Sequence, residues 1–314
     1  MALAALGDMA RCRRTRAVAL GVVRAGLGGV LARPSGVRLV NRLHRHLSPA
    51  QKRRFFYAFL DGAYPVEGDW IVDFAGRPIR LPLRRDFSLS WCAAIGFHGY
   101  DAEIHDLYER LATGAHRPRV FFDVGASYGL HSLRWLVHGV RTVSFEPNPA
   151  CHAWFRECCE RNGVQPEIHG VAVADNAGTA ELAVPGEAPY EATIVSEVRA
   201  GWVGRRDVHL CIVPQISLDD FVAEHGVRPD LVKIDTEGGE RLVISGARDV
   251  LERARPLVVF ESWPGSADRP TIFALLESVG YRIEPLGGPS CPAAPLSRDG
   301  FCAAAVMNFL ARPQ

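Results

Sequence analysis

Acidic side chains close a series of short apolar segments along the chain. Such segments include VFFDVG, TVSFEP, DLVKID and LVVFES, and the acids at or near their ends are Asp123, Glu146, Asp175, Asp235, Glu237 and Glu261. Carboxylates gathered at one edge of a sheet repel one another, which raises the cost of keeping them all ionised. A cationic or hydroxyl-rich ligand would relieve that cost, so these side chains are the candidates for chemistry.

A glycine-containing loop, DVGASYG, follows the first of these segments. Gly125 and Gly129 permit a tight turn and a close approach of a ligand to the backbone. The helix expected next directs its N-terminal amides toward the same place. Glu146 lies 21 residues after Gly125, close to the spacing at which an acid on the second strand accepts hydrogen bonds from ribose hydroxyls. The combination indicates a nucleoside cofactor.

The loop also discriminates between cofactors. A dinucleotide site uses the pattern G-x-G-x-x-G, which GASYGL does not match. Asp123, immediately before the loop, would repel a diphosphate but would favour the ammonium and sulfonium groups of S-adenosylmethionine. The sequence therefore favours a methyltransferase. Two alternatives remain at this stage: an NAD(P)-dependent oxidoreductase on a Rossmann fold, and a non-catalytic scaffold with a methyltransferase-like fold.

Strands that alternate with helices must position these residues. Near-continuous apolar strands separated by helices of ordinary length predict a mostly parallel α/β sheet covered on both faces. In such a sheet the ligand lies beyond the carboxyl ends of the strands. We expect EIHGVAVAD to form one strand, Phe301–Leu310 to form the last, and Thr179–Val184 and Val208–Val213 to form two more.

The segments FFDVGASYGLHS, SFEPNP, AVAD, LVKIDTEGGE, SGA and PLVVFE, in this order and spacing, resemble the FkbM family of S-adenosylmethionine-dependent methyltransferases. The resemblance runs from about Val120 to Ser262. It implies a Rossmann-like methyltransferase fold with a mostly parallel seven-stranded sheet and an antiparallel last strand. It also implies O-methylation of a hydroxyl on a saccharide, glycolipid or secondary metabolite. Ser127 stands where the family usually carries Asn, and Gly239 where a larger residue is more common.

The resemblance assigns S-adenosylmethionine to the glycine loop and the strand ends. Asp123 and the loop would hold the methionine part, and Glu146 would hold the ribose. The adenine would be bordered by Asp175 or by the backbone around Ala172. The predicted cofactor-binding residues are therefore Asp123, Gly125, Ala126, Ser127, Gly129, Glu146 and Asp175.

The remaining acids are the predicted catalytic residues. Asp235 or Glu237 would accept the proton of the acceptor hydroxyl or orient it, and Glu261 with Trp263 would form the acceptor wall. Two adjacent acids could instead hold a divalent cation, but no histidine joins them, so no metal site is predicted. Lys233, one of two lysines in the chain, is expected to pair with a neighbouring carboxylate.

Composition limits the class of protein. The chain has 314 residues, of which 48% are hydrophobic and 23% charged, with a formal net charge of +1, so it can bury a sizeable core and is not a collagen, a coiled coil or a disordered chain. Its longest apolar run, Ala17–Leu31, contains Arg24 and is too short and too polar for a comfortable membrane span. The eight cysteines form no CxxC pair, which suits a reducing, cytoplasmic setting.

Charge is distributed unevenly along the chain. Residues 1–54 hold 12 lysines and arginines against one acid, Asp8, whereas the rest has 24 basic and 34 acidic residues. We predict a basic arm over residues 1–54, a helical and hairpin annex over 55–117, and a methyltransferase domain over 118–314. The annex is expected to begin with a short apolar helix at Phe55–Tyr64. The arm favours peripheral contact with an anionic membrane. No base-reading module accompanies it, so the expected partner is a small-molecule acceptor and not a nucleic acid.

Overall fold

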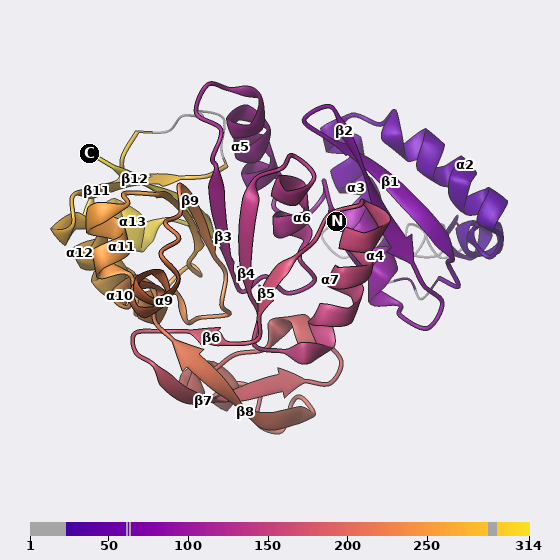
Figure 1. The fold of residues 1–314 in the computed structure, drawn as a ribbon. Coiled ribbons are helices and arrows are strands. Elements are labelled where there is room, and N and C mark those ends of the chain that lie inside the picture. Colours follow the sequence, from indigo (N-terminus) through magenta and orange to yellow (C-terminus); the bar gives the residue numbers. More distant parts are fainter. Residues whose placement is uncertain (1–22, 61, 63, 288–293) are drawn as a thin grey trace, which may run out of the picture. The chain divides into compact units, whose positions relative to one another are not determined.

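The computed structural model describes residues 23–60, 62, 64–287 and 294–314 (Figure 1). The chain forms two compact units, Met1–Tyr100 and Asp101–Gln314. Helix α5 (Ala102–Thr113), which the sequence analysis placed in the annex, belongs to the second unit. The predicted domain boundaries after residues 54 and 117 stay predictions.

The first unit is built on the predicted hairpin. Strands β1 (Gly68–Phe74) and β2 (Arg77–Leu83) pair in antiparallel register. Ala75 and Gly76 connect them with φ angles of 44° and 78°, the left-handed pair that a two-residue hairpin turn favours. Among the described residues of this unit, three helices have both of their ends defined: α2 (Pro34–Arg45), α3 (Pro49–Phe59) and α4 (Leu89–Gly96).

Helix α3 begins earlier than the sequence analysis predicted. Its start was expected at Phe55, where the apolar run begins, but the helix starts at Pro49. Ser48 accepts a hydrogen bond from the backbone N–H of Gln51, and the Gln51 side chain accepts one from the Ser48 N–H. This capping box fixes the helix start six residues ahead of the apolar run.

The second unit contains a seven-stranded sheet with the order β11-β12-β10-β9-β3-β4-β5. Strand β12 is antiparallel to both of its neighbours, and the pairs among β10, β9, β3, β4 and β5 are parallel. The predicted α/β sheet, mostly parallel with an antiparallel last strand, is confirmed. The strands are β3 (Val120–Val124), β4 (Arg141–Phe145), β5 (Glu167–His169), β9 (Leu231–Ile234), β10 (Leu257–Glu261), β11 (Tyr281–Pro285) and β12 (Asn308–Pro313).

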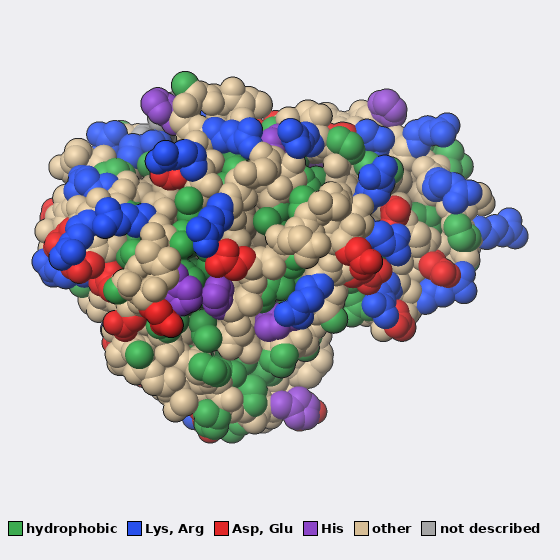
Figure 2. Space-filling model, viewed as in Figure 1, with side chains coloured by type: hydrophobic (Ala, Val, Ile, Leu, Met, Phe, Trp, Pro, Cys, Tyr) green, Lys and Arg blue, Asp and Glu red, His purple; other side chains and the backbone are tan. Residues whose placement is uncertain are grey.

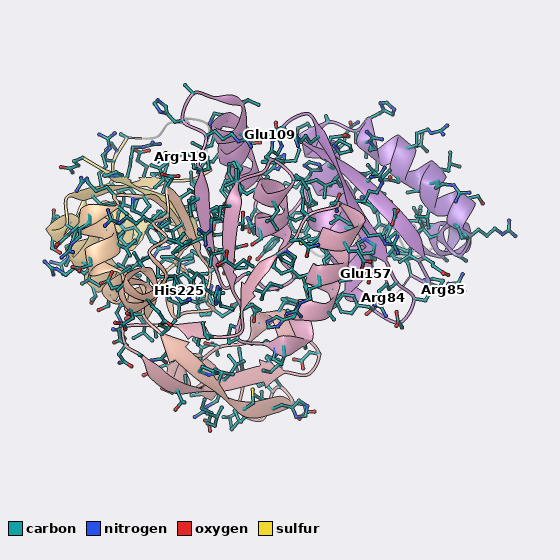
Figure 3. All side chains as sticks on the ribbon, viewed as in Figure 1. Arg84, Arg85, Glu109, Arg119, Glu157 and His225 are labelled. Carbon is teal, nitrogen blue, oxygen red and sulfur yellow. The ribbon has the colours of Figure 1, made fainter. Side chains whose placement is uncertain are left out.

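Helices cover both faces of this sheet, as the apolar strands require. Successive residues of β3 show the two faces: the Phe121 ring packs against Trp135, whereas the Phe122 ring packs against Phe221 of α9. His225, labelled in Figure 3, also lies on α9 and stacks on Phe221. The helices that remain are α6 (Leu130–Leu136), α7 (Pro149–Arg161), α8 (Ser196–Ala200), α9 (Leu218–His225), α10 (Glu240–Ser245), α11 (Arg248–Arg253), α12 (Arg269–Ser278) and α13 (Arg298–Ala303), with a 3-10 turn at Pro189–Glu191.

None of the helices in the described part of the chain has the length and apolar character needed to cross a lipid bilayer. The run Ala17–Leu31 falls partly within residues 1–22, which lie outside the described residues.

Two predicted strands were wrong. EIHGVAVAD does not form one strand: β5 ends at His169, and β6 (Ala172–Val173) joins a separate three-stranded sheet with β8 (Val208–Ile216) and β7 (Gly178–Pro185). Gly170 separates the two pieces, which lets the chain change direction. The segment Phe301–Leu310 begins as the end of helix α13, because Ser297 caps that helix by accepting from the Gly300 N–H.

Arg269 ties the last helix and strand to the sheet. Its guanidinium is fully buried and donates to four backbone carbonyls, those of Ser262, Phe301, Ala304 and Val306, at 2.6–2.9 Å. It also lies 5.1 Å from the centre of the Phe309 ring. These bonds hold the irregular connection between α13 and β12 in place.

We expect Arg269→Met to lower the free energy of unfolding by about 3 kcal/mol or more, because it leaves several buried carbonyls without a donor. Urea titration followed by circular dichroism measures this. Arg298→Met, on the exposed first turn of α13, serves as the control and should change stability little. Equal stability of the two variants would contradict this role of Arg269.

Candidate functional site

A cavity lies at the carboxyl ends of β3, β4 and β9, bordered on a further side by the three-stranded sheet. The cavity is open to solvent, and its empty space together with the solvent-filled mouth is about 500 Å³. The lining residues are Val124, Gly125, Ser127, Phe145, Glu146, Pro147, Val171, Ala172, Val173, Leu182, Tyr190, Ala192, Ile194, Asp235, Thr236 and Glu237. The position agrees with the rule for open α/β sheets.

The glycine loop passes directly against the end of β9. Gly125 has a φ of 76°, and a Cβ placed on it would lie 1.7 Å from the Asp235 carbonyl oxygen. Only glycine fits there. Gly129 has a φ of 72°, and a Cβ there would lie 2.2 Å from the Phe155 ring. Ser127 has a φ of 49°, a left-handed conformation that Asn tolerates better, which is a physical reason for the Asn common at this position.

Glu146 joins the loop to the end of β4. One carboxylate oxygen accepts from the Ser127 N–H at 2.7 Å and the other from the Asn148 N–H at 2.8 Å. The side chain is 6% exposed and lines the cavity. Burial raises the pKa of Glu146 to about 7, although the two N–H donors oppose the rise. The predicted ribose-binding residue therefore reaches the cavity and also holds the loop in place.

Lys233 pairs with Asp235 inside the sheet, as predicted. Lys233 is 2% exposed, and its Nζ lies 2.7 Å from Asp235 Oδ2. Burial alone would lower the pKa of Lys233, but the charges of Asp235, Asp123 and Asp101 raise it above its usual value. Burial alone would likewise raise the pKa of Asp235, but the charge and hydrogen bond of Lys233 lower it. This acid is thus held in its ionised form.

Asp123 is fully buried beside this pair, and its carboxylate turns toward α6. Its Oδ2 accepts from Ser132 Oγ at 2.6 Å, and its Oδ1 has no hydrogen-bond partner in the described part of the chain. Burial raises the pKa of Asp123. Asp123 is not among the residues that line the cavity, so its contact with the cofactor stays a prediction.

Asp101 joins the same cluster and was missed by the sequence analysis. It adopts a left-handed conformation with a φ of 48°, and its Oδ1 accepts from Asn308 Nδ2 at 3.1 Å. Burial raises its pKa to about 6, while the charge of Lys233 opposes the rise. In the sequence Asp101 stands directly before a helix, where acidic residues are common because they interact favourably with the helix dipole. Its position therefore gave no indication that it belongs to the site.

Two further acids at the strand ends have raised pKa values. Glu237, on a left-handed turn with a φ of 53°, lines the cavity. Burial and the charge of Asp235 raise its pKa to about 8. Burial and Asp235 also raise the pKa of Glu261, which shares a side-chain hydrogen bond with Asp235. Glu261 does not line the cavity.

The remaining predicted residues fall outside the cavity or beside it. Asp175 is exposed and accepts from the Asn176 side chain, whereas Ala172, the alternative for the adenine, lines the cavity. Ala126 and Gly129 shape the loop without lining the cavity. Within the described residues, no group of three His, Cys, Asp or Glu side chains is arranged to hold a metal ion.

The apolar wall of the cavity was also missed. Leu182, Ala192 and Ile194 contribute to it, together with the Tyr190 ring. Three of these residues follow β7 in the irregular stretch 186–195, which has neither helical nor strand periodicity. No signal in the sequence could have placed that stretch at the cavity.

Comparison with known proteins agrees with this architecture. A family model described as methyltransferase FkbM domain matches residues 115–283. The chain is 29% identical over 192 residues to methyltransferase sdnD of Sordaria araneosa, an alignment covering 51% of this chain and 73% of the relative. It is 28% identical over 194 residues to 31-O-demethyl-FK506 methyltransferase FkbM of Streptomyces tacrolimicus, covering 52% and 73%.

A solved structure of methyltransferase FkbM from Methylobacillus flagellatus has 15% identity and a TM-score of 0.39. The alignment covers 71% of this chain and 54% of that one, so the chain spans about half the length of this solved relative.

The sheet order with its antiparallel strand, the glycine loop and the cavity at the strand ends define a Rossmann-like methyltransferase. The match covers more than half of the sequence, and the chain belongs to the FkbM family of methyltransferases. This membership decides against the NAD(P)-dependent oxidoreductase.

We expect Gly125→Ala to destabilise the protein more than Gly139→Ala. Both glycines have a positive φ, 76° and 72°, but a Cβ at Gly139 meets nothing within 4 Å. Gly139→Ala should therefore cost only the left-handed conformation, about 1–2 kcal/mol, whereas Gly125→Ala must also push the loop away from Asp235. The free energies of unfolding in urea measure both. Equal losses of unfolding free energy in the two variants would contradict the close approach of Gly125 to the Asp235 carbonyl.

Proposed function

We propose that this protein transfers the methyl group of S-adenosylmethionine to a hydroxyl oxygen of a small-molecule acceptor, and that the acceptor is a saccharide, glycolipid or secondary metabolite. Membership in a methyltransferase family supports the reaction class. The observation that carries the proposal is the cavity at the ends of β3, β4 and β9, with Glu146 on one side and Glu237 on the other.

The residues of the cavity fit the parts of the cofactor. Glu146 retains free lone pairs for the ribose hydroxyls after accepting two N–H donors. Val173, Leu182 and Ile194 offer an apolar wall for the adenine ring. When bound, S-adenosylmethionine supplies an electrophilic methyl group on a positively charged sulfur.

The buried acids favour a cationic ligand beside the cavity. Asp101, Asp123 and Asp235 all face the charge of Lys233, and Asp123 Oδ1 lacks a partner among the described residues. A positive charge brought close to these carboxylates would lower the cost of keeping them ionised. We assign this role to the methionine end of the cofactor.

Glu237 is the proposed proton acceptor. Its pKa of about 8 lies near neutral pH, where a carboxylate is a more effective base than one with an ordinary pKa. Asp235, held ionised by Lys233, would orient the acceptor hydroxyl. Glu261, kept protonated by burial and by Asp235, would donate its proton to the hydrogen bond with Asp235 and fix that carboxylate.

The acceptor class rests on the aromatic side chain beside this acid. A Cβ on Gly238, which follows Glu237, would lie 3.9 Å from the Trp263 ring, so the ring stands next to the proposed base. Aromatic rings pack against the apolar faces of hydroxyl-rich molecules such as sugars. The relative from Streptomyces tacrolimicus is named for methylation of an oxygen of FK506, which supports an oxygen acceptor.

We expect Glu146→Gln to weaken binding of S-adenosylhomocysteine by roughly 10-fold or more, because the substitution removes a charged acceptor of hydrogen bonds. Isothermal titration calorimetry on both proteins measures the change. Glu160→Gln, on an exposed position of α7, should bind as the wild type does. Unchanged affinity in Glu146→Gln would refute the ribose placement.

We expect kcat/KM for methyl transfer to rise with pH up to about pH 8, because Glu237 must lose its proton to act as a base. Glu237→Gln should lower the rate by about 100-fold or more and abolish the rise. The assay uses methyl-labelled S-adenosylmethionine with a panel of saccharides, glycolipids and hydroxylated metabolites, and Glu160→Gln is again the control. An unchanged pH profile in Glu237→Gln would exclude Glu237 as the base. Absence of transfer to every acceptor would favour the non-catalytic scaffold.

A further inference from the structure

Helix α2 (Pro34–Arg45) has its polarity reversed relative to an ordinary surface helix. It buries Asn41 and His44, which are 5% and 2% exposed, together with Val37. It leaves Leu39 and Leu43 in water, 54% and 61% exposed. Buried polar residues and exposed apolar patches are informative, whereas a single exposed leucine is not. Here Asn41 and His44 are buried on one side of the helix, while Leu39 and Leu43, one turn apart, lie together on the exposed side.

The buried face of α2 is fixed on the hairpin of the same unit. The Asn41 side chain donates to the Ile71 carbonyl and accepts from the Ile71 N–H, both at 2.9 Å. The His44 ring lies 5.1 Å from the rings of Trp70 and Phe55. Burial, with the nearby charge of Lys52, lowers the pKa of His44 to about 4, so the ring stays neutral. The helix therefore cannot turn its leucines inward.

Arginines flank the exposed leucines. Arg38 and Arg42, four residues apart, lie on the same helical face as Leu39 and Leu43. Neither has an acidic partner among the described residues, whereas Arg45 at the edge of this face pairs with Asp73 at 2.9 Å. Figure 2 shows the blue arginine side chains and green hydrophobic side chains interspersed over α2. We call Arg38, Leu39, Arg42 and Leu43 the outer face of α2.

We infer that the outer face of α2 docks on an anionic lipid surface. Such a surface takes up both kinds of side chain: leucines enter the boundary of the acyl chains, and arginines pair with lipid phosphates. The arginines also speak against a second copy of this chain as the occupant, because two such faces would bring like charges together. Residues 1–54 hold 12 basic residues and one acid, and this positive charge adds a long-range attraction to an anionic surface.

This inference does not depend on the proposed catalytic reaction. It accounts for the outer face whether the acceptor is a lipid-linked sugar or a free metabolite. It is also distinct from the membrane prediction made for residues 1–54 as a whole, because it assigns the contact to one helical face whose residues are named.

The test is sedimentation of the full chain with lipid vesicles. We expect binding to phosphatidylcholine vesicles that contain phosphatidylserine, weaker binding at high salt, and little binding to phosphatidylcholine alone. Arg38→Gln with Arg42→Gln should reduce the partition coefficient about 30-fold, from about 1 kcal/mol for each basic residue. Leu39→Ser with Leu43→Ser should reduce it as well, with methyl-transfer activity in solution unchanged.

The control is Leu210→Ser with Ile212→Ser, which removes two exposed apolar side chains of β8, 53% and 69% exposed, and should leave vesicle binding unaffected. Thermal melting of each variant checks that the fold is retained. Wild-type affinity in both α2 variants would overturn the inference, as would failure of the wild type to bind the anionic vesicles. Light scattering tests the other occupant, a second copy of the chain. If the wild type is a dimer and the Leu39→Ser, Leu43→Ser variant is a monomer, the inference is overturned in favour of a second copy.

Discussion

One buried ammonium group, that of Lys233, sets the electrostatics at the ends of the central strands. It forms an ion pair with Asp235 and faces Asp101 and Asp123 as well. Burying carboxylates is costly unless they are paired. Besides Lys233, the buried guanidinium of Arg134 lies close enough to Asp101 and Asp123 to interact with their charges. Burial, together with the charge of Asp235, raises the pKa values of Asp101, Glu237 and Glu261. A cationic ligand brought close to these carboxylates would lower the cost of keeping them ionised.

Three strand ends are locked together around that charge. Gly125 touches the carbonyl of Asp235, which brings the loop after β3 against the end of β9. Glu146 binds the N–H of Ser127, which brings the end of β4 against the same loop. Glu240 accepts from the N–H groups of Thr236 and Gly238 and fixes the turn that carries Glu237. Because all of these contacts are made within the fold, they hold the walls of the cavity in place without help from a ligand, which reduces the ordering cost of binding.

The sequence predicted the parts of the site that depend on local pattern. An apolar run that ends in an acid located Glu146 and Asp235, and glycine spacing located the loop. The prediction failed where the contacting residues are far apart in the sequence. Asp101 is held by a hydrogen bond with Asn308. The stretch 186–195 borders the cavity beside the three-stranded sheet. The prediction also failed where a helix cap overrides an apolar pattern. Ser297 caps helix α13, so the segment that begins at Phe301 starts as the end of a helix and not as a strand.

Helix α2 shows a further limit of pattern-based prediction. Hydrophobic periodicity assigns the leucines of a helix to the core, yet here the hairpin offers the Ile71 backbone, which an amide side chain satisfies and a leucine cannot. The helix therefore packs with Asn41 against the hairpin, and Leu39 and Leu43 lie on the opposite, exposed face. The proposed lipid surface would remove these leucines from water again. The arginines beside them would favour a surface with negative charge, just as the carboxylates at the strand ends would favour a ligand with positive charge.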